Sequence, residues 1–329
     1  MDLDLDDGWR MLTTQQHKYA YFRDDSHFRE GWQTALDVLG DRAPAVLQRI
    51  AVVTVKPDAI IGRKVEGALD FMTANDFRPI HAETFSYDRI MTRELWRYQW
   101  NVATLDRLDL GDRVHQRSAA LATFFLDVAA RRRVPACTRL VPLKGSAFPA
   151  SRHGDQLRTR LGAPNRILVL VHCPDEPIDI VRELAVMFDR ERLVRLYTEL
   201  GARVDDERTA NLDEHIAQLY ADCPAGTLSV EQARSVILAE LAARAPDCPA
   251  ATRAREALLA ADAGQSLSWT DWQRDLRTCG IGSDRWEVVL VATHFVQHDV
   301  PGARCLVSRT GRQKWAAGEG RMIPELATT

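Results

Sequence analysis

The residue best placed for chemistry in this sequence is His172, which follows five consecutive aliphatic residues, Ile167 to Val171. A run of this kind predicts a strand that is buried on both faces. Pro174 and Pro177 end the strand and suit the first turn of a helix, and apolar residues then recur at helical spacing as far as Phe188. We therefore expect an imidazole at the end of a buried strand and before a helix N-terminus, where it can meet an anion. The alternative is a core histidine that only ends the strand.

A second buried run, Ala51 to Val55, also ends in a charged residue, in the order Lys56-Pro57-Asp58, and Gly62-Arg63 follow it. Together with His172 this segment resembles the nucleoside diphosphate kinases. Their Val-Lys-Pro-Asp-Gly signature precedes a helix, and their last strand leads into a histidine that is phosphorylated during turnover. Two motifs in the right order are more specific than either motif alone.

The resemblance implies roles for three residues. His172 would take the terminal phosphate of a magnesium-bound nucleotide and pass it to a nucleoside diphosphate. Glu183, eleven residues later and followed by Met187-Phe188, would brace the imidazole, while Lys56 would contact the phosphates or the sugar hydroxyl. The alternatives are an ordinary carboxylate on a helix face and a surface lysine at a strand end.

The loop before the histidine adds candidate phosphate-binding residues. Arg158 follows the segment Gly145-Ser-Ala-Phe-Pro149 at the interval of a phosphate-binding arginine in the family, and a guanidinium is a natural clamp for phosphoryl oxygens. It lies one residue further from His172 than in the family, so Arg160 is a rival and a solvated loop arginine is the alternative. Ser146 stands beside Ala147, which occupies the place of a phosphate-holding threonine.

Other departures affect the expected activity. Val169 stands where the family has a ribose-binding asparagine, and Cys173-Pro174 replace Gly-Ser. A helix with a second phosphate-binding arginine is expected to be missing, because Val134–Leu143 reads as a strand that runs almost directly into the loop. Each lost contact to a charged group costs about 1.5–3 kcal/mol. The sequence therefore predicts a divergent phosphotransferase that acts through a phosphohistidine, on a non-standard nucleotide or metabolite. The alternative is a catalytically degenerate module that binds a nucleotide or a protein.

These residues require a mixed α and β domain. Alternating and β-branched segments predict four strands at Ile50–Val55, Phe77–Phe85, Val134–Leu143 and Ile167–Val171. Helical periodicity predicts helices at Val65–Ala74, around Arg93–Trp100 and at Ser118–Arg131. This order fits a ferredoxin-like, split β-α-β arrangement, which is also the fold that the resemblance implies.

Three regions are expected along the chain. Residues 1–49 form a helical extension, residues 50–200 the nucleoside diphosphate kinase-like domain, and residues 201–329 a mainly helical domain of unknown role. The predicted elements of the last region are helices at Asp206–Tyr220, Ser229–Ala243, Ala250–Ala261 and from Ser268, and a final hairpin of Trp286–Phe295 and Ala303–Ser308. The resemblance implies self-association, for which we expect a dimer.

Composition excludes several classes of protein. With 329 residues and a formal net charge of -3, the chain lacks the basic domain of a general nucleic-acid binder. No apolar run approaches the ~20 residues that span a bilayer, and the acidic start lacks the plan of a signal peptide. We therefore expect a cytoplasmic protein with no nucleic-acid or membrane partner.

Cysteines and the remaining histidines offer weaker candidates. The six cysteines show no metal-binding spacing, so reduced thiols and no metal site are expected. His294 and His298 have an i, i+4 spacing, but on the predicted strand they would lie about 13 Å apart, too far for one ion. Cys173 and His172 are adjacent, so on a strand they point to opposite faces and make a poor nucleophile–base pair.

Overall fold

The computed structural model describes residues 8–129, 133–206, 208–307 and 310–323. Its centre is a four-stranded antiparallel sheet in the order β2-β3-β1-β4. The strands are β1 (Ile50–Val55), β2 (Phe77–Phe85), β3 (Ala120–Asp127) and β4 (Val171–His172). With helices between β1 and β2 and between β3 and β4, this is the strand order of the split β-α-β fold, and the expected fold class is confirmed.

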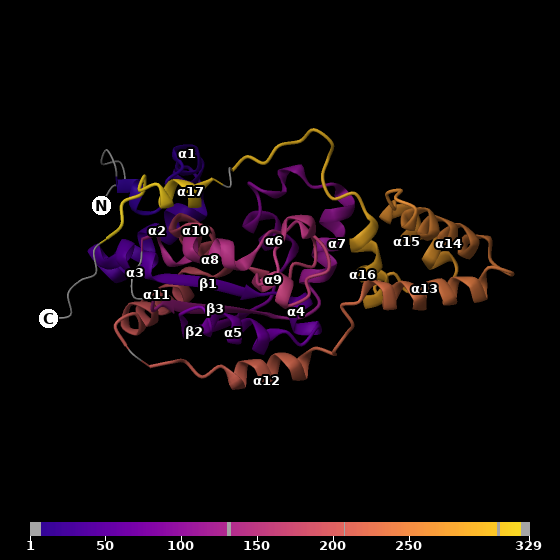
Figure 1. Cartoon of the computed structure of the whole chain (residues 1–329), viewed down its shortest axis with the longest axis horizontal. Helices are drawn as coiled ribbons and strands as arrows, with labels where there is room; N and C mark the ends of the chain where they lie inside the picture. Colours follow the sequence, from indigo (N-terminus) through magenta and orange to yellow (C-terminus); the bar gives the residue numbers. More distant parts are fainter. Residues whose placement is uncertain (1–7, 130–132, 207, 308–309, 324–329) are drawn as a thin grey trace.

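Helices cover both faces of the sheet (Figure 1). One face is covered by α4 (Pro57–Ile61), α5 (Val65–Thr73), α8 (Ala136–Lys144), α9 (Leu157–Arg160) and α12 (Asp213–Asp222). The other is covered by α2 (Ser26–Leu39), α3 (Ala43–Arg49), α10 (Pro177–Met187) and α11 (Arg190–Arg203). Successive residues of β1 therefore enter different cores: Val52 packs with the second set of helices and Val53 with the first. A strand buried on both faces explains the unbroken apolar run.

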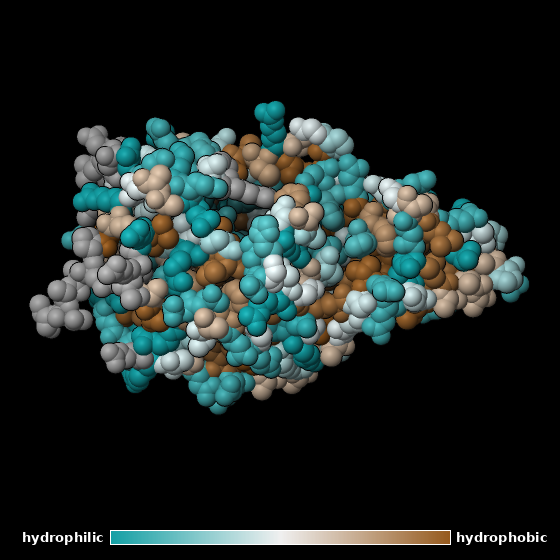
Figure 2. All heavy atoms as spheres, in the orientation of Figure 1, coloured by the Kyte–Doolittle hydropathy of each residue, from teal (hydrophilic) through white to brown (hydrophobic). Residues whose placement is uncertain are grey.

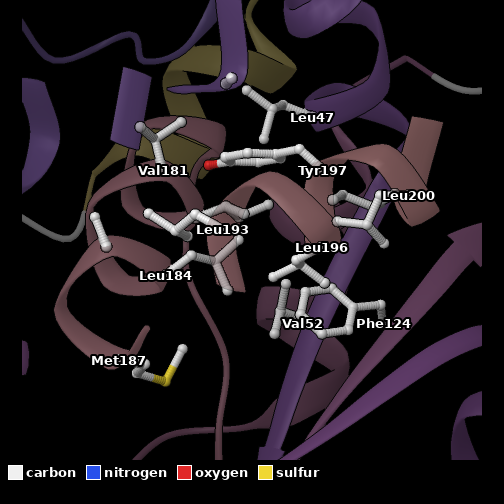
Figure 3. Packing of buried hydrophobic residues seen from close by; sticks show 14 of the residues in the cluster. Leu47, Val52, Phe124, Val181, Leu184, Met187, Leu193, Leu196, Tyr197 and Leu200 are labelled. Carbon is white, nitrogen blue, oxygen red and sulfur yellow. The ribbon is translucent and has the colours of Figure 1, made fainter. Parts of the chain in front are cut away.

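Figure 3 shows the second of these cores from close by. Tyr197 of α11 lies beneath Leu47 of α3 and beside Val181 of α10, while Val52 and Phe124 of the sheet lie next to Leu196. The N-terminal extension and α11 thus bury a face of the sheet that would otherwise meet water. The extension also contains α1 (Gln16–Arg23), and its helical prediction is confirmed for the described part, residues 8–49.

The remaining helices form a long connection and an arm (Figure 1). Between β2 and β3 lie α6 (Arg89–Leu95) and α7 (Leu105–His115). The arm consists of α13 (Val230–Arg244), α14 (Pro249–Asp262), α15 (Trp269–Thr278) and α16 (Trp286–Phe295), which enclose a core of their own with part of α7. Beyond α16 the chain returns over the body to α17 (Gly311–Ala316).

The surface is mixed in character. Figure 2 shows a largely hydrophilic face with hydrophobic side chains scattered over it and more frequent along the arm. Val236 of α13 and Leu259 of α14 are among the exposed large hydrophobic residues there. Within the described residues, no helix combines the length and the apolar character that crossing a membrane requires.

Four predicted strands are wrong in part or entirely. Val134–Leu143 is helix α8, and the third strand is β3, in the middle of the predicted helix Ser118–Arg131, whose residues 130 and 131 lie outside the described part. Only Val171 of the predicted strand Ile167–Val171 is in β4. The predicted hairpin is also wrong, since Trp286–Phe295 is helix α16 and residues 303–307 are irregular; Ser308 lies outside the described residues.

The other predicted elements hold with shifted ends. β1 and β2 have the predicted bounds. The ends of α5, α13 and α14 lie no more than one residue from their own predicted ends. The predicted Asp206 helix starts only at Asp213, as α12, and the predicted helix around Arg93–Trp100 is α6 followed by a turn. The sequence did not indicate α11.

A buried carboxylate joins the two ends of the chain to the middle. Glu176, which caps α10, has no exposed surface and accepts hydrogen bonds from Thr13 Oγ1 at 2.9 Å, Lys18 Nζ at 3.0 Å and Trp315 Nε1 at 2.9 Å. Gln15 Nε2 donates to it at 2.6 Å. Burial opposes ionisation, but Lys18 and the surrounding donors outweigh burial and lower the pKa of Glu176.

We expect Glu176→Gln to lower the free energy of unfolding by about 3–5 kcal/mol, because it leaves buried Lys18 with one carboxylate fewer and points an NH₂ group at donors. Urea unfolding followed by circular dichroism measures this. The matched control is Asp37→Asn, which removes a carboxylate that pairs with Arg190 at the surface. That change should lower the free energy of unfolding by no more than about 1 kcal/mol. Equal losses of stability in the two variants would contradict the large contribution expected of Glu176.

Candidate active site

The carboxyl end of β1 and the start of β4 place two of the predicted residues side by side. Thr54 pairs with His172 and Val55 with Val171 in the antiparallel register. Lys56 follows directly, and its backbone N–H donates to Leu170 O at 2.9 Å. The sheet therefore brings together the two motifs that lie more than a hundred residues apart in the sequence.

The residues before β4 form tight turns instead of an extended strand. Val169 N donates to Ile167 O at 3.1 Å and Val171 N to Val169 O at 2.8 Å, which are the two-residue spacings of γ-turns. Leu170 has a φ of 65°, a region that leucine rarely adopts. Asp58 Oδ2 accepts its N–H at 2.9 Å. This contact holds the chain in a strained conformation next to the histidine.

Both ring nitrogens of His172 have partners. Nε2 lies 2.7 Å from Glu183 Oε2 on α10, and Trp96 Nε1 donates to Nδ1 at 3.4 Å. An indole N–H can only donate, so Nδ1 is the unprotonated nitrogen and Nε2–H donates to Glu183. The side chain of His172 is 16% exposed. The nucleophilic lone pair would therefore be on Nδ1, on the side of Trp96.

Aromatic rings hold Trp96 in place. Its ring stacks on Trp100 at a centroid distance of 4.7 Å, on His115 at 4.9 Å and on Tyr87 at 6.0 Å. It meets His172 edge-on at 5.4 Å and 89°. Burial, together with the neighbouring charge of Lys56, lowers the pKa of His115, which keeps the middle of this stack uncharged.

Lys56 and Arg158 are buried and directed at backbone oxygens. Lys56 is 2% exposed; its Nζ donates to Ile167 O at 3.1 Å and lies 3.8 Å from Asp58 Oδ1. Arg158 donates to Gly145 O at 3.0 Å and Val171 O at 2.8 Å. Burial lowers the pKa of Arg158 to about 10. Burial also lowers the pKa of Lys56, where Asp58 opposes the change and Arg158 and Arg107 add to it.

A cavity of about 660 Å³ connects these groups. His172, Glu183, Lys56, Arg158 and Ser146 all line it, as do Ala147 and Val169, the positions at which the sequence departs from the family. Ser146 Oγ accepts the N–H of Phe148 at 3.1 Å, which shapes the loop. Arg160 lies outside the lining and packs over the ring of Phe71.

The expectation of a missing helix before this loop is wrong, because α8 occupies that place. Its arginine, Arg139, pairs with Asp127 at the far end of β3, at 2.7 Å. At its C-terminal end Lys144 lines the cavity and donates to Cys173 O and Asp175 Oδ1, both at 2.9 Å.

Three cavity residues carried no sequence signal: Trp96, Arg107 and Arg166. None belongs to a motif, and each reaches the cavity from a connection whose path the sequence did not indicate. Cys173 stays unsuitable as a nucleophile, because burial raises the pKa of its thiol to about 11. His294 lies in the last turn of α16 and His298 follows the helix, so the strand geometry on which this pair was rejected is wrong.

Similarity to known proteins is found among solved structures. No protein-family model and no curated protein matches the chain. Among solved structures, the chain is similar to a nucleoside diphosphate kinase from Encephalitozoon cuniculi, with 13% identity and a TM-score of 0.35 over 42% of this chain and 87% of the other. It is also similar to the Aquifex aeolicus nucleoside diphosphate kinase, with 14% identity and a TM-score of 0.36 over 43% and 95%.

The tautomer of His172 is open to a direct test. We expect ¹⁵N NMR of the neutral ring to show Nε2 protonated and Nδ1 unprotonated, because Glu183 accepts from one nitrogen and Trp96 donates to the other. In Trp96→Phe, the Nδ1 signal should move towards that of a nitrogen without a hydrogen bond. Trp100→Phe is the matched control, since Trp100 stacks on Trp96 and has no hydrogen bond to His172. A protonated Nδ1 in the unmodified protein would contradict this geometry.

Proposed function

We propose that residues 50–190 form a divergent phosphotransferase of the nucleoside diphosphate kinase type, which carries phosphate on His172. The observation that supports it most is the 2.7 Å contact of His172 with Glu183 beside a cavity that is also lined by Lys56 and Arg158. A carboxylate on Nε2 leaves Nδ1 as the nucleophile, and the buried cations suit the phosphates of a nucleotide.

The chemistry needs only these groups and the phosphates. The Nδ1 lone pair attacks the terminal phosphorus of a nucleoside triphosphate, and the bond from that phosphorus to the diphosphate oxygen breaks with its electron pair. The ring becomes positively charged and Glu183 stabilises it through Nε2–H. Reversal onto an acceptor, a nucleoside diphosphate or a related phosphorylated metabolite, regenerates His172.

Magnesium would enter with the phosphates. Mg²⁺ usually keeps waters and binds one or two carboxylates besides substrate phosphates. Asp175 fits that role, since its half-exposed side chain lines the cavity and only its Oδ1 is bonded to Lys144, whereas Glu183 is engaged by His172. The metal would neutralise phosphate charge, and this chain would contribute the cations Lys56 and Arg158.

The second candidate function is a module that binds a nucleotide or a partner without chemistry. The specific observation in its favour is that the N–H of Trp96 donates to Nδ1 of His172. In addition, Lys56 and Arg158 donate hydrogen bonds to backbone oxygens. Phosphate transfer requires Trp96 to turn away or to donate to the phosphate instead.

By resemblance, either module would form a dimer, which light scattering after size exclusion would reveal.

Labelling separates the two functions. With γ-labelled ATP and magnesium, the protein should acquire an acid-labile, base-stable label, and His172→Ala should lose it. His81→Ala is the matched control, because His81 also contacts a carboxylate, Glu83 at 3.0 Å, but lies on β2 outside the cavity lining. Glu183→Gln should slow labelling by about tenfold or more without abolishing it, because it removes orientation and charge but leaves the nucleophile.

The decisive negative result combines two measurements. If calorimetry shows that the unmodified protein binds ATP and no label appears, the phosphotransferase is excluded and the binding module stands. If His81→Ala loses the label as well as His172→Ala, the label does not report His172.

A further inference from the structure

A carboxylate from the C-terminal region lies between two arginines at the edge of the cavity. Asp299 Oδ1 lies 2.5 Å from Arg107 Nη1, and Asp299 Oδ2 lies 2.7 Å from Arg166 Nη2. Arg107 comes from α7, and Arg166 from the coiled segment before β4. All three residues line the same cavity as His172. One carboxylate oxygen on each guanidinium is the arrangement in which a phosphate group would also be held.

The two guanidinium groups are fixed before any ligand arrives. Arg107 is 8% exposed at its side chain and lies over the ring of Trp100 at 5.3 Å, and Arg166 lies over Phe148 at 3.8 Å. Arginines held on aromatic faces lose little freedom when they bind an anion.

The arginines also keep donor capacity that Asp299 does not use. The buried Nε atoms of Arg107 and Arg166 have no hydrogen-bond partner among the described residues. Burial, together with the nearby Arg166, lowers the pKa of Arg107 to about 10, although Asp299 opposes this. One carboxylate thus neutralises only part of the charge here, and a phosphate with three oxygens would match these donors better.

The segment that carries Asp299 lies on the surface and is held mainly by hydrogen bonds. Residues 300–306 are exposed. Backbone bonds join Val300 N to Val102 O at 2.8 Å, Leu306 N to Tyr98 O at 3.1 Å and Thr104 N to His298 O at 3.1 Å. Side-chain bonds of Asn101, Thr104 and Cys305 add to these. Figure 1 shows this stretch passing along the outside of the body between α16 and α17. A segment with so little buried surface can be displaced at low free-energy cost.

We propose that Arg107 and Arg166 form an anion subsite for a phosphate group of the ligand that enters the His172 cavity, and that Asp299 fills it until the ligand displaces it. The subsite lies outside the motif residues. It deepens the proposed function and rests on it for what the ligand does at His172. The substrate class is then a ligand with more than one phosphate group, and residues 297–306 act as a competing internal anion.

The test uses the full chain and inorganic pyrophosphate as the probe, measured by calorimetry. Asp299→Asn keeps the shape of the side chain and removes its charge, so pyrophosphate should bind about tenfold more tightly than to the unmodified protein. Arg166→Gln should weaken binding by about tenfold or more, since it removes one charge-assisted contact. Arg107→Gln serves as a second variant if it folds.

Asp205→Asn is the matched control. Asp205 also bridges two arginines, Arg42 and Arg49, but it is exposed and lies outside the cavity lining. Its affinity for pyrophosphate should equal that of the unmodified protein. If Asp299→Asn binds pyrophosphate no more tightly than the Asp205→Asn control, the subsite is wrong.

Trypsin reports the displacement itself. Arg304 is exposed within the segment, so pyrophosphate should speed cleavage after it in the unmodified protein, and Asp299→Asn should be cleaved rapidly without the probe. Slower cleavage with the probe bound would overturn the displacement. A chain that passes both tests but gives no His172 label retains the subsite and lacks the phosphotransferase activity. A chain that is labelled but fails these tests has the phosphotransferase activity and lacks the subsite.

Discussion

The ionised carboxylate of Glu176 is the contact on which the placement of the site depends. It caps α10, the helix that carries Glu183 to His172, and it takes its hydrogen bonds from both ends of the chain, from Thr13 to Lys18 on one side and Trp315 on the other. A buried carboxylate is tolerated only if it is charged against a cation and fully hydrogen-bonded. Because those donors come from segments about three hundred residues apart, both segments contribute to holding α10 in place.

The cavity that results holds several buried cations. Burial lowers the pKa of Lys56, Arg107 and Arg158, and the two arginines lie close enough to Lys56 to lower its pKa further. In the described chain they are balanced by backbone oxygens and by two carboxylates, Asp58 and Asp299. Burial destabilises the charged form of these side chains. An anion that binds beside them therefore stabilises them strongly, because the low local dielectric strengthens each contact.

The sequence could predict the parts of this site that obey a local pattern. β1, β2 and α5 have clear periodicity or flanking turns, and Lys56 and His172 follow from two motifs. β3 was misread because all of its residues are buried, and α16 because residues 288–293 are, so neither shows a period that separates strand from helix. The run before His172 was read as a strand for the same reason. Ile167 and Leu168 are buried by the arm, and only the structure shows the γ-turn hydrogen bonds and the Asp58 contact to Leu170 that define the conformation of the run.

Arg107 and Arg166 could not be predicted, because their meeting depends on how the arm packs. Ile167 and Leu168 lie in the core of the arm, and Asn165 Nδ2 donates to Thr293 Oγ1 of α16 at 2.9 Å. The segment that leads into His172 is therefore supported from one side by the sheet and from the other by residues beyond 201. It follows that residues beyond 201 support one wall of the site, and that a ligand which displaces Asp299, as proposed, also breaks its contact with Arg166. Ligand binding in the cavity and displacement of the C-terminal segment are then coupled in one equilibrium.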